Sequence, residues 1–245
     1  MFQYFDKIRE LLDMVEHTER PNILKAIDAI VKANLEKSSI YIFGASHAGI
    51  LSEELYYRAG GMITINAIFA RELMLDRQPI TFTSTMERLE GYGTAIASTI
   101  EFHRGDILIL HSVSGRNPVI IDMAMAAQKK GVCIIALTNL TYSQSVSSRH
   151  SSGKRLFELA DIVIDNHGEI GDAACNIAGT ELKVGPTSTV IGAAILDDVI
   201  VEASRAISKK TASQVPVFYS ANLEGGDIEN KRLVKEYTDM IHYNF

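Results

Sequence analysis

Cysteine is scarce in this sequence, which contains only Cys133 and Cys175 among its 245 residues. Two thiols without the spacing of a disulfide framework favour a reducing compartment, and we therefore expect a cytoplasmic protein. The first residues also lack the basic and then apolar pattern of a secretory signal peptide. The histidines show no ligand spacing with each other or with the cysteines, so we expect neither a metal site nor a cofactor.

Positive charge and long apolar runs are lacking as well. The 24 Lys and Arg residues and the 30 Asp and Glu residues give a net charge of −6, which argues against a general binder of nucleic acids or anionic membranes. The longest apolar stretch, 190–201, is interrupted by Asp197 and Asp198, so no segment is expected to span a membrane. We accordingly expect neither nucleic acid nor a membrane as a partner, while a local positive pocket for a small anion stays compatible with the composition.

Apolar residues are plentiful, at 47% of the chain, and their pattern predicts an α/β fold. Short β-branched runs predict five strands, at 40–43, at 62–69, from 107 onward, at 132–137 and at 162–164. Segments with helical spacing alternate with these runs. The alternation predicts a three-layer αβα sandwich around a five-stranded parallel sheet of the flavodoxin-like kind.

We expect a single domain over 1–245, because no linker or internal repeat divides the chain. Its core is expected at about 40–206, with two extra helices over 2–36 and a C-terminal tail over 207–245 that contains a further helix.

Four segments carry expectations that bear on a functional site. Residues 86–102 are expected to form one helix, and a long apolar helix is expected from about 187 to 207. The polar, Ser-rich segment 141–152 is too long for an ordinary connection, which favours a functional or flexible loop. Residues 165–180 show no regular pattern.

Small polar residues follow the third predicted strand and lead into a predicted helix that begins at Pro118. Such a segment offers hydroxyl donors and free backbone N–H groups to an anion. The donors would come from Ser112, Ser114, Gly115, Arg116 and Asn117. The segment 44–47 follows the first strand, and the carboxyl ends of parallel strands meet at one edge of a sheet. The pattern therefore predicts that Ser46 and Ser114 share one phosphate-binding cavity.

These motifs also have other interpretations. Ser112 and Ser114 alone are equally consistent with a polar strand end that only caps the next helix. A nucleophile elbow is excluded because no glycine precedes either serine by two residues. The segment 43–49 lacks the three glycines of a dinucleotide-binding loop, and 152–154 lacks the upstream glycine of a P-loop.

The sequence resembles the SIS (sugar isomerase) family of phosphosugar-binding domains over roughly 40–206. The resemblance lies in FGASHAG, in HSVSGRNPVIIDMAMAAQKKGVCIIALTN and in SSGKRLFELADIVID. Within that family, SGRNP and LKVGPTST are most similar to the N-acetylmuramic acid 6-phosphate etherases, and the phosphoheptose isomerases are the other near relatives. The chain departs from the family pattern in 141–152 and in the tail after Pro216.

The resemblance implies that the phosphate of a small sugar is bound by Ser46, Ser112, Ser114 and the backbone N–H groups through Asn117. Thr187 and Ser188, which open the long helix, would close the pocket. His47 directly follows Ser46 and either contacts the ligand or faces away from it. Arg116 either clamps the anion or points outward.

Chemistry on such a substrate needs a base that removes the proton next to a carbonyl, and a carboxylate suits this step. The candidates are Glu53, Glu54, Glu87 and Glu90, although a glutamate on a helix is more often a solvated surface residue. The etherases have a glutamate in a similar Glu-Gly context, which favours Glu90 first. The isomerases have one on the helix after the first loop, which favours Glu54 second.

His150 lies in the Ser-rich segment 141–152 beside Arg149. A histidine there would open the sugar ring or protonate a leaving oxygen, unless the segment is simply an exposed loop. We therefore name it as a third catalytic candidate.

The resemblance implies an aldose–ketose isomerase of sugar phosphates that acts through an enediolate. An etherase-like lyase would share the first step and then expel an ether substituent, and a non-catalytic phosphosugar sensor would only bind. Members of the family commonly dimerise, so we expect a homodimer with pockets near its interface. The apolar helix 187–207 and the two N-terminal helices offer the surfaces for it.

Overall fold

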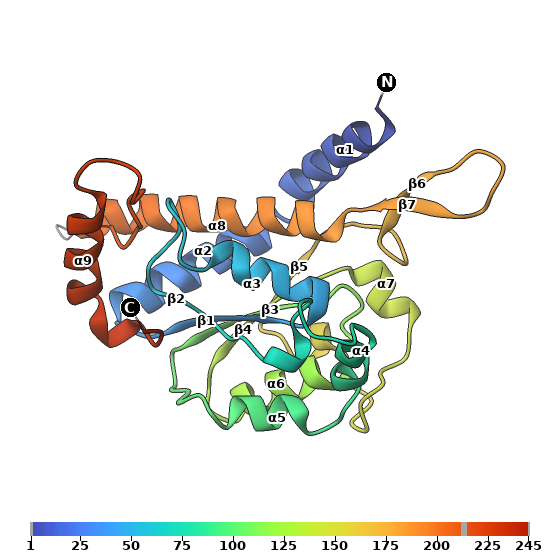
Figure 1. Ribbon diagram of the computed structural model, residues 1–245, viewed down its shortest axis with the longest axis horizontal. Helices are drawn as coiled ribbons and strands as arrows, with labels where there is room; N and C mark the ends of the chain where they lie inside the picture. Colours follow the sequence, from blue (N-terminus) through green and yellow to red (C-terminus); the bar gives the residue numbers. More distant parts are fainter. Residues whose placement is uncertain (1, 212–214, 245) are drawn as a thin grey trace.

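The architecture is an open parallel sheet with helices on both faces (Figure 1). The computed structural model describes residues 2–211 and 215–244. The sheet consists of β1 (Ile40–Gly44), β2 (Ile65–Ala67), β3 (Ile107–His111), β4 (Cys133–Thr138) and β5 (Ile162–Asp165). All neighbours are parallel, in the order β2-β1-β3-β4-β5. The predicted α/β sandwich with a five-stranded flavodoxin-like sheet is confirmed.

Both faces of the sheet are buried, which explains why the strands are continuous apolar runs. Ile40 and Ile42 of β1 belong to the hydrophobic core on one face, whereas Tyr41 and Phe43 belong to the core on the other. Successive side chains of a strand point to opposite faces, so each strand contributes to both cores.

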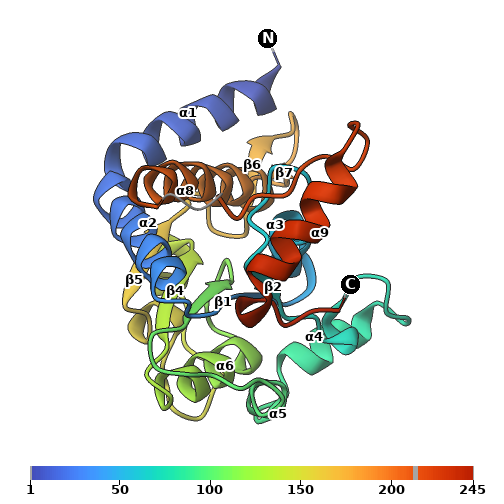
Figure 2. The same cartoon turned by 90° about the vertical axis from the view of Figure 1, so that its left-hand side faces the viewer.

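The helices form two layers that cover these cores (Figures 1 and 2). One face is covered by α1 (Gln3–Thr18), α2 (Arg20–Leu35), α3 (Ile50–Leu55) and α8 (Ser188–Lys210). The other face is covered by α5 (Tyr92–Ala97), α6 (Pro118–Gln128) and the 3-10 turn η3 (Leu156–Glu158). Because α8 spans the sheet, it anchors the first layer along its whole length.

Two elements extend beyond the sheet at one end of the molecule, as Figure 1 shows. They are α1 and the antiparallel hairpin of β6 (Ala173–Asn176) and β7 (Lys183–Pro186). The Tyr4 hydroxyl of α1 donates to the carbonyl oxygen of Pro186 at 2.6 Å and so links the two elements. At the other end, α9 (Gly226–Glu236) and η4 (Thr238–Met240) close the fold.

The structure corrects three expectations about local structure. Residues 86–102 do not form one helix: α4 (Thr81–Glu87) ends before Gly91, whose φ of +90° breaks the helix, and α5 follows. The expected loop 141–152 begins within α7 (Leu140–Ser145). The segment 165–180, which showed no regular pattern, contains β6.

The remaining 3-10 turns are η1 (Ser46–Gly49) and η2 (Arg71–Leu73). No helix within the described ranges is long and apolar enough to cross a membrane.

Candidate functional site

A cavity of about 290 Å³ opens at the carboxyl ends of β1 and β3. The strand β2 lies on one side of β1 and β3 lies on the other, so the chain connections diverge between β1 and β3. Ligands of open parallel sheets bind at such a point. The cavity is lined by Ala45, Ser46, His47, Ala48, Glu87, His111, Ser112, Val113, Ser114, Asn117, Val119, Ile120, Tyr142, Gly171 and Asp172.

The segment after β1 forms a sharp turn beside this cavity. A side chain at Gly44 is excluded, because a Cβ there would lie 2.4 Å from the carbonyl oxygen of Ala48. Ser46 has a φ of +52°, a left-handed conformation that is uncommon for a residue with a side chain. The turn places Ser46 and the exposed His47 in the cavity wall.

The segment after β3 supplies more of the wall. The Ser112 hydroxyl oxygen accepts a hydrogen bond from the backbone N–H of Gly115 at 3.2 Å. Gly115 has a φ of +58°, and a Cβ there would lie 3.0 Å from Oγ of Ser143, so this turn requires glycine. Ser114 lines the same cavity as Ser46.

The helix α6 begins at this wall. Its N-cap residue, Asn117, makes no side-chain capping bond to the helix. The first-turn N–H groups of Val119 and Ile120 therefore receive no acceptor from the cap residue, and both residues line the cavity. Free N–H groups and the positive end of the helix dipole favour an anion. Hydroxyl donors and a helix N-terminus thus meet in one cavity, which is a donor set suited to phosphate.

Glu87, the last residue of α4, joins the two strand ends. One carboxylate oxygen accepts a hydrogen bond from the Ser46 hydroxyl, and the other accepts from Nδ2 of Asn117 at 2.6 Å. The side chain is half-buried and lines the cavity. Glu87 is the one glutamate among the lining residues, and the break between α4 and α5 determines its position.

The two glutamates that the sequence favoured as bases lie elsewhere. Glu90 accepts hydrogen bonds from the hydroxyl and the backbone N–H of Ser151, the latter at 3.0 Å, and these bonds lower the pKa of Glu90. Glu54 of α3 forms an ion pair with Arg58, which follows that helix. Neither glutamate is among the residues that line the cavity.

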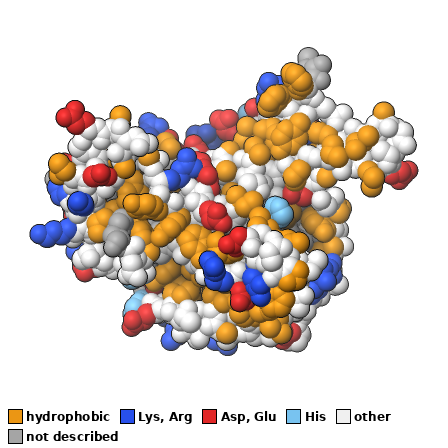
Figure 3. All heavy atoms as spheres, viewed as in Figure 1, with side chains coloured by type: hydrophobic (Ala, Val, Ile, Leu, Met, Phe, Trp, Pro, Cys, Tyr) orange, Lys and Arg blue, Asp and Glu red, His pale blue; other side chains and the backbone are white. Residues whose placement is uncertain are grey.

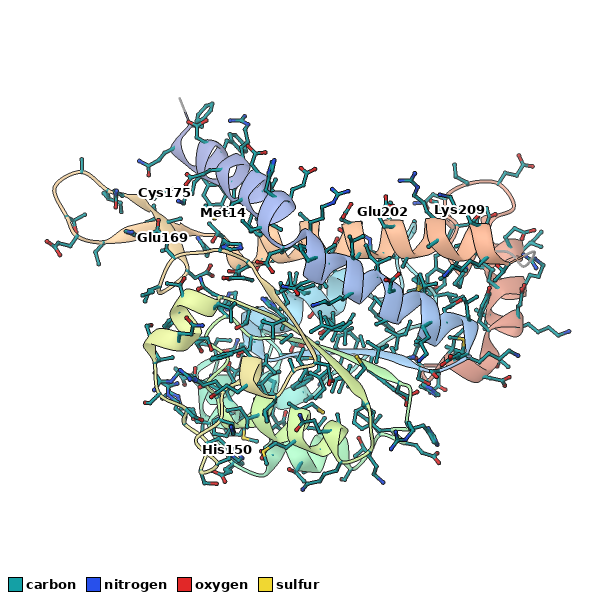
Figure 4. All side chains as sticks on the ribbon, turned by 180° about the vertical axis from the view of Figure 1, so that it is seen from behind. Met14, His150, Glu169, Cys175, Glu202 and Lys209 are labelled. Carbon is teal, nitrogen blue, oxygen red and sulfur yellow. The ribbon has the colours of Figure 1, made fainter. Side chains whose placement is uncertain are left out.

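His150 is likewise separate from this cavity. Its Nε2 lies 3.1 Å from Oδ1 of Asp122, and its Nδ1 lies 2.8 Å from Oγ of Ser152. The imidazole borders a different hollow, between α5 and α6, of about 540 Å³. Figure 4 shows His150 at the lower edge of the molecule, across the sheet from α8.

Thr187 and Ser188 are buried at the start of α8 and contact Asp172 instead of the cavity. The backbone N–H groups of both residues donate to Oδ1 of Asp172, at 3.0 and 2.8 Å, and the Ser188 hydroxyl donates to Oδ2 at 2.6 Å. Asp172 itself lines the cavity. A carboxylate of the chain therefore occupies the anion position at the N-terminus of α8.

Arg116 belongs to the segment between β3 and α6 but does not line the cavity. Its Nη2 lies 3.5 Å from Oγ of Ser147, and its Nε is buried without a hydrogen-bond partner among the described residues. The guanidinium therefore keeps unused donor capacity close to the site.

His111 is a residue of the site that no motif of the sequence indicates. It is 1% exposed, and burial lowers the pKa of its imidazole, so the ring is neutral at pH 7. Its Nδ1 lies 3.0 Å from the carbonyl oxygen of Ala48. A carbonyl only accepts, so the ring proton is on Nδ1 and His111 ties the end of β3 to the turn after β1. No sequence signal distinguishes this role from that of any buried strand residue.

Comparisons with known proteins give the family of the chain and structures that share its fold. A family model described as SIS domain matches residues 3–139. A UPF0309 protein of Shouchella clausii is 49% identical over 241 residues, which cover 98% of each chain. A phosphoheptose isomerase from Francisella tularensis superimposes with a TM-score of 0.53 at 15% identity, covering 82% of this chain and 95% of that one. A phosphoheptose isomerase from Neisseria gonorrhoeae gives a TM-score of 0.52 at 13% identity, covering 84% and 95%.

Proposed function

Because the chain belongs to the SIS domain family, we propose that its cavity binds a small phosphorylated sugar and that the protein is a sugar-phosphate isomerase. The observation that carries the proposal is that Ser46, Ser114 and Glu87 line one cavity at the N-terminus of α6. The fold shared with the phosphoheptose isomerases of two organisms supports this class of ligand.

The phosphate is held by the donors of the two strand ends. Ser112 and Ser114 donate their hydroxyl hydrogens, and the N–H groups of Asn117 and of the first turn of α6 complete the set. Ser46 has a single O–H, which donates to Glu87 when no phosphate is bound. Donation from Ser46 to phosphate therefore frees one oxygen of Glu87 to accept a proton.

Glu87 is the base in this proposal. Its freed oxygen takes the proton from the carbon next to the open-chain carbonyl, and the electron pair of that C–H bond forms the C=C bond of an enediolate. The same carboxyl returns the proton to the neighbouring carbon, while a proton moves from the hydroxyl oxygen to the former carbonyl oxygen. Asn117 holds the other oxygen of Glu87 during both steps.

The base is tested by turnover of pentose, hexose and heptose phosphates. Glu87→Gln is expected to lower kcat by about 10²–10⁴-fold, because a general base contributes this much, and to leave ligand binding within a few-fold. Glu54→Gln is the matched control and is expected to keep most of the activity, because Glu54 pairs with Arg58 away from the cavity. Glu90→Gln tests the other candidate base. Loss of turnover in Glu54→Gln or Glu90→Gln with normal activity of Glu87→Gln would transfer the role to that residue.

The phosphate site is tested separately by thermal unfolding with ligand. Sugar phosphates are expected to raise the melting temperature, and Ser114→Ala is expected to reduce that rise, because only the native state binds. Unphosphorylated sugars are the control and are expected to give no rise. A sugar phosphate that binds without any turnover would favour a sensor, and release of an ether substituent would favour the lyase. Equal shifts with and without phosphate would contradict the proposal.

A further inference from the structure

The segment 146–155 carries Arg149, whose side chain contacts a residue of the cavity wall. The backbone N–H of Arg149 donates to the carbonyl oxygen of Arg116 at 2.9 Å, and Nη1 donates to Oδ1 of Asn117 at 2.9 Å. Asn117 lines the cavity and also donates to Glu87. The guanidinium of Arg149 is thus one hydrogen bond away from the cavity wall.

Three arginines, Arg149, Arg116 and Arg88, lie close enough to one another to interact electrostatically. Partial burial, and next to it repulsion from Arg116 and Arg88, lower the pKa of Arg149, and these effects outweigh the attraction of Tyr142 and Glu87. None of the three arginines forms an ion pair with a described carboxylate, whereas Arg155 of the same segment pairs with Glu158. The chain contains more acidic than basic residues, 30 against 24, so carboxylates that could pair with these arginines are not scarce. The unneutralised cluster therefore points to an anion that comes from outside the chain.

Two carboxylates hold Arg149 in place from its C-terminal side. Asp122 accepts from Nε2 of His150 at 3.1 Å, and Glu90 accepts from the backbone N–H of Ser151 at 3.0 Å. These contacts fix the two residues that follow Arg149 against α6 and the turn between α4 and α5. Glu90 and His150 therefore act on the site through the position of Arg149.

We infer that Arg149, together with Arg88 and Arg116, binds a second oxyanion of the ligand, so that the ligand is a sugar phosphate with a further acidic group. The inference rests on the proposed function for the phosphate. The phosphate donors, Ser114 and the first turn of α6, line the cavity itself, whereas none of the three arginines lines it. The arginines are placed for a group farther out on the same molecule. A carboxylate or a second phosphate has the oxygen geometry that a guanidinium fork binds.

The test uses pairs of ligands that differ by one acidic group, measured by isothermal titration. The pairs are glucose 6-phosphate with 6-phosphogluconate, fructose 6-phosphate with fructose 1,6-bisphosphate, and N-acetylglucosamine 6-phosphate with N-acetylmuramic acid 6-phosphate. Wild-type protein is expected to bind the doubly acidic member of at least one pair more tightly. The pair that responds distinguishes a carboxylate from a second phosphate.

Arg149→Ala is expected to weaken binding of that doubly acidic ligand by about 10- to 100-fold, the loss typical of a charged hydrogen bond. Its singly acidic partner is expected to lose less than about threefold. Lys154→Ala is the matched control, because Lys154 is an exposed cation of the same segment, and it is expected to change neither affinity.

Equal losses for both members of a pair and for inorganic phosphate would show that Arg149 holds the phosphate itself and would overturn the inference. So would the absence of any preference for doubly acidic ligands in wild-type protein that binds the monophosphates. If wild-type protein binds no phosphorylated sugar, the proposed function itself is wrong, and the inference that rests on it is wrong as well.

Discussion

The side chain of Glu87 is held in place by hydrogen bonds from two other segments as well as by its position at the end of α4. Its carboxylate accepts from Ser46, which follows β1, and from Asn117, which follows β3. Glu90, three residues later, lies beyond the end of α4 and accepts from Ser151 instead. Two glutamates that are close in sequence therefore serve different parts of the molecule, one in the cavity and one in the support of Arg149.

At the same scale, Cys133 gives a pH-dependent prediction. Burial raises the pKa of its thiol to about 11, and the nearby Asp161 adds to this effect. In a Cys175→Ser variant, the rate of alkylation of Cys133 is expected still to rise at pH 10, because only the thiolate reacts. The same variant unfolded in urea is the control, and its rate is expected to level off near the ordinary thiol pKa. A plateau near pH 9 in the folded protein would contradict the prediction.

The raised pKa of Cys133 also has a consequence for stability. The thiol ionises more easily in the unfolded chain, where its pKa is 9.0, than in the folded one, where it is about 11. Its contribution to stability is therefore fully present below pH 9 and is lost between pH 9 and about 11.

At the scale of elements, Asp122 of α6 connects two segments that are distant in sequence. Its Oδ2 accepts from the backbone N–H of Gly91 at 2.6 Å, in the turn between α4 and α5, and its Oδ1 accepts from His150 at 3.1 Å. The carboxylate is 5% exposed. One buried side chain therefore holds the turn that ends α4 and the segment that carries Arg149.

We expect Asp122→Asn to lower the free energy of unfolding by about 1–3 kcal/mol, because one of the two donors then loses its acceptor in a buried place. Urea unfolding measures the loss of free energy of unfolding. Backbone hydrogen exchange is expected to accelerate in 88–92 or in 146–155, where the donor has lost its acceptor. Asp28→Asn on the exposed face of α2 is the control and is expected to stay within about 0.5 kcal/mol. Unchanged stability and exchange would contradict the connecting role.

How far the sequence predicted these elements depended on their burial. The five strands of the sheet were predicted because both of their faces are buried, which produces continuous apolar runs. The hairpin of β6 and β7 was not predicted, because most residues of β7 are exposed and its sequence shows no alternation of apolar and polar residues. The break between α4 and α5 was missed because the helical spacing continues across Gly91, whose left-handed conformation is a property of the folded chain.

The sequence predicted the site residues that follow strands of the sheet, but not those that reach the cavity from the end of a helix or from an irregular segment. Ser46 and Ser114 meet because parallel strands place their carboxyl ends together. Glu87 and Asp172 reach the same cavity through the end of α4 and the segment before β6, whose paths no local pattern indicates. Asp172 in turn separates Thr187 and Ser188 from the cavity.

At the scale of the whole molecule, α1 leaves an apolar surface exposed. Phe2 and Phe5 are 78% and 58% exposed, and a groove of about 630 Å³ runs between α1, α2 and α8. Figure 3 shows hydrophobic side chains gathered along α1 and the neighbouring hairpin. Exposed apolar side chains beside a groove are typical of an interface, and we propose that a second copy of the chain covers the groove between α1, α2 and α8.

The homodimer is tested by light scattering coupled to size-exclusion chromatography. Wild-type protein is expected to elute as a dimer, and Leu24→Glu, which places a charge in the groove, is expected to shift it to a monomer. Ile228→Glu on α9 is the control, because Ile228 is 73% exposed but lies outside the groove. A wild-type monomer at all concentrations would contradict the proposal, as would a Leu24→Glu variant that remains a dimer.

The carboxylate at the start of α8 has a consequence for which anions this edge of the sheet selects. Asp172 is tethered to the helix that it caps, so its local concentration far exceeds that of any solute, and dilution does not remove it. A free oxyanion must displace this internal competitor to occupy α8, whereas α6 has no such occupant from its cap residue. Of these two helix N-termini, only that of α6 is left open to an anion from solution, so Asp172 makes this edge of the sheet selective for a single anion position.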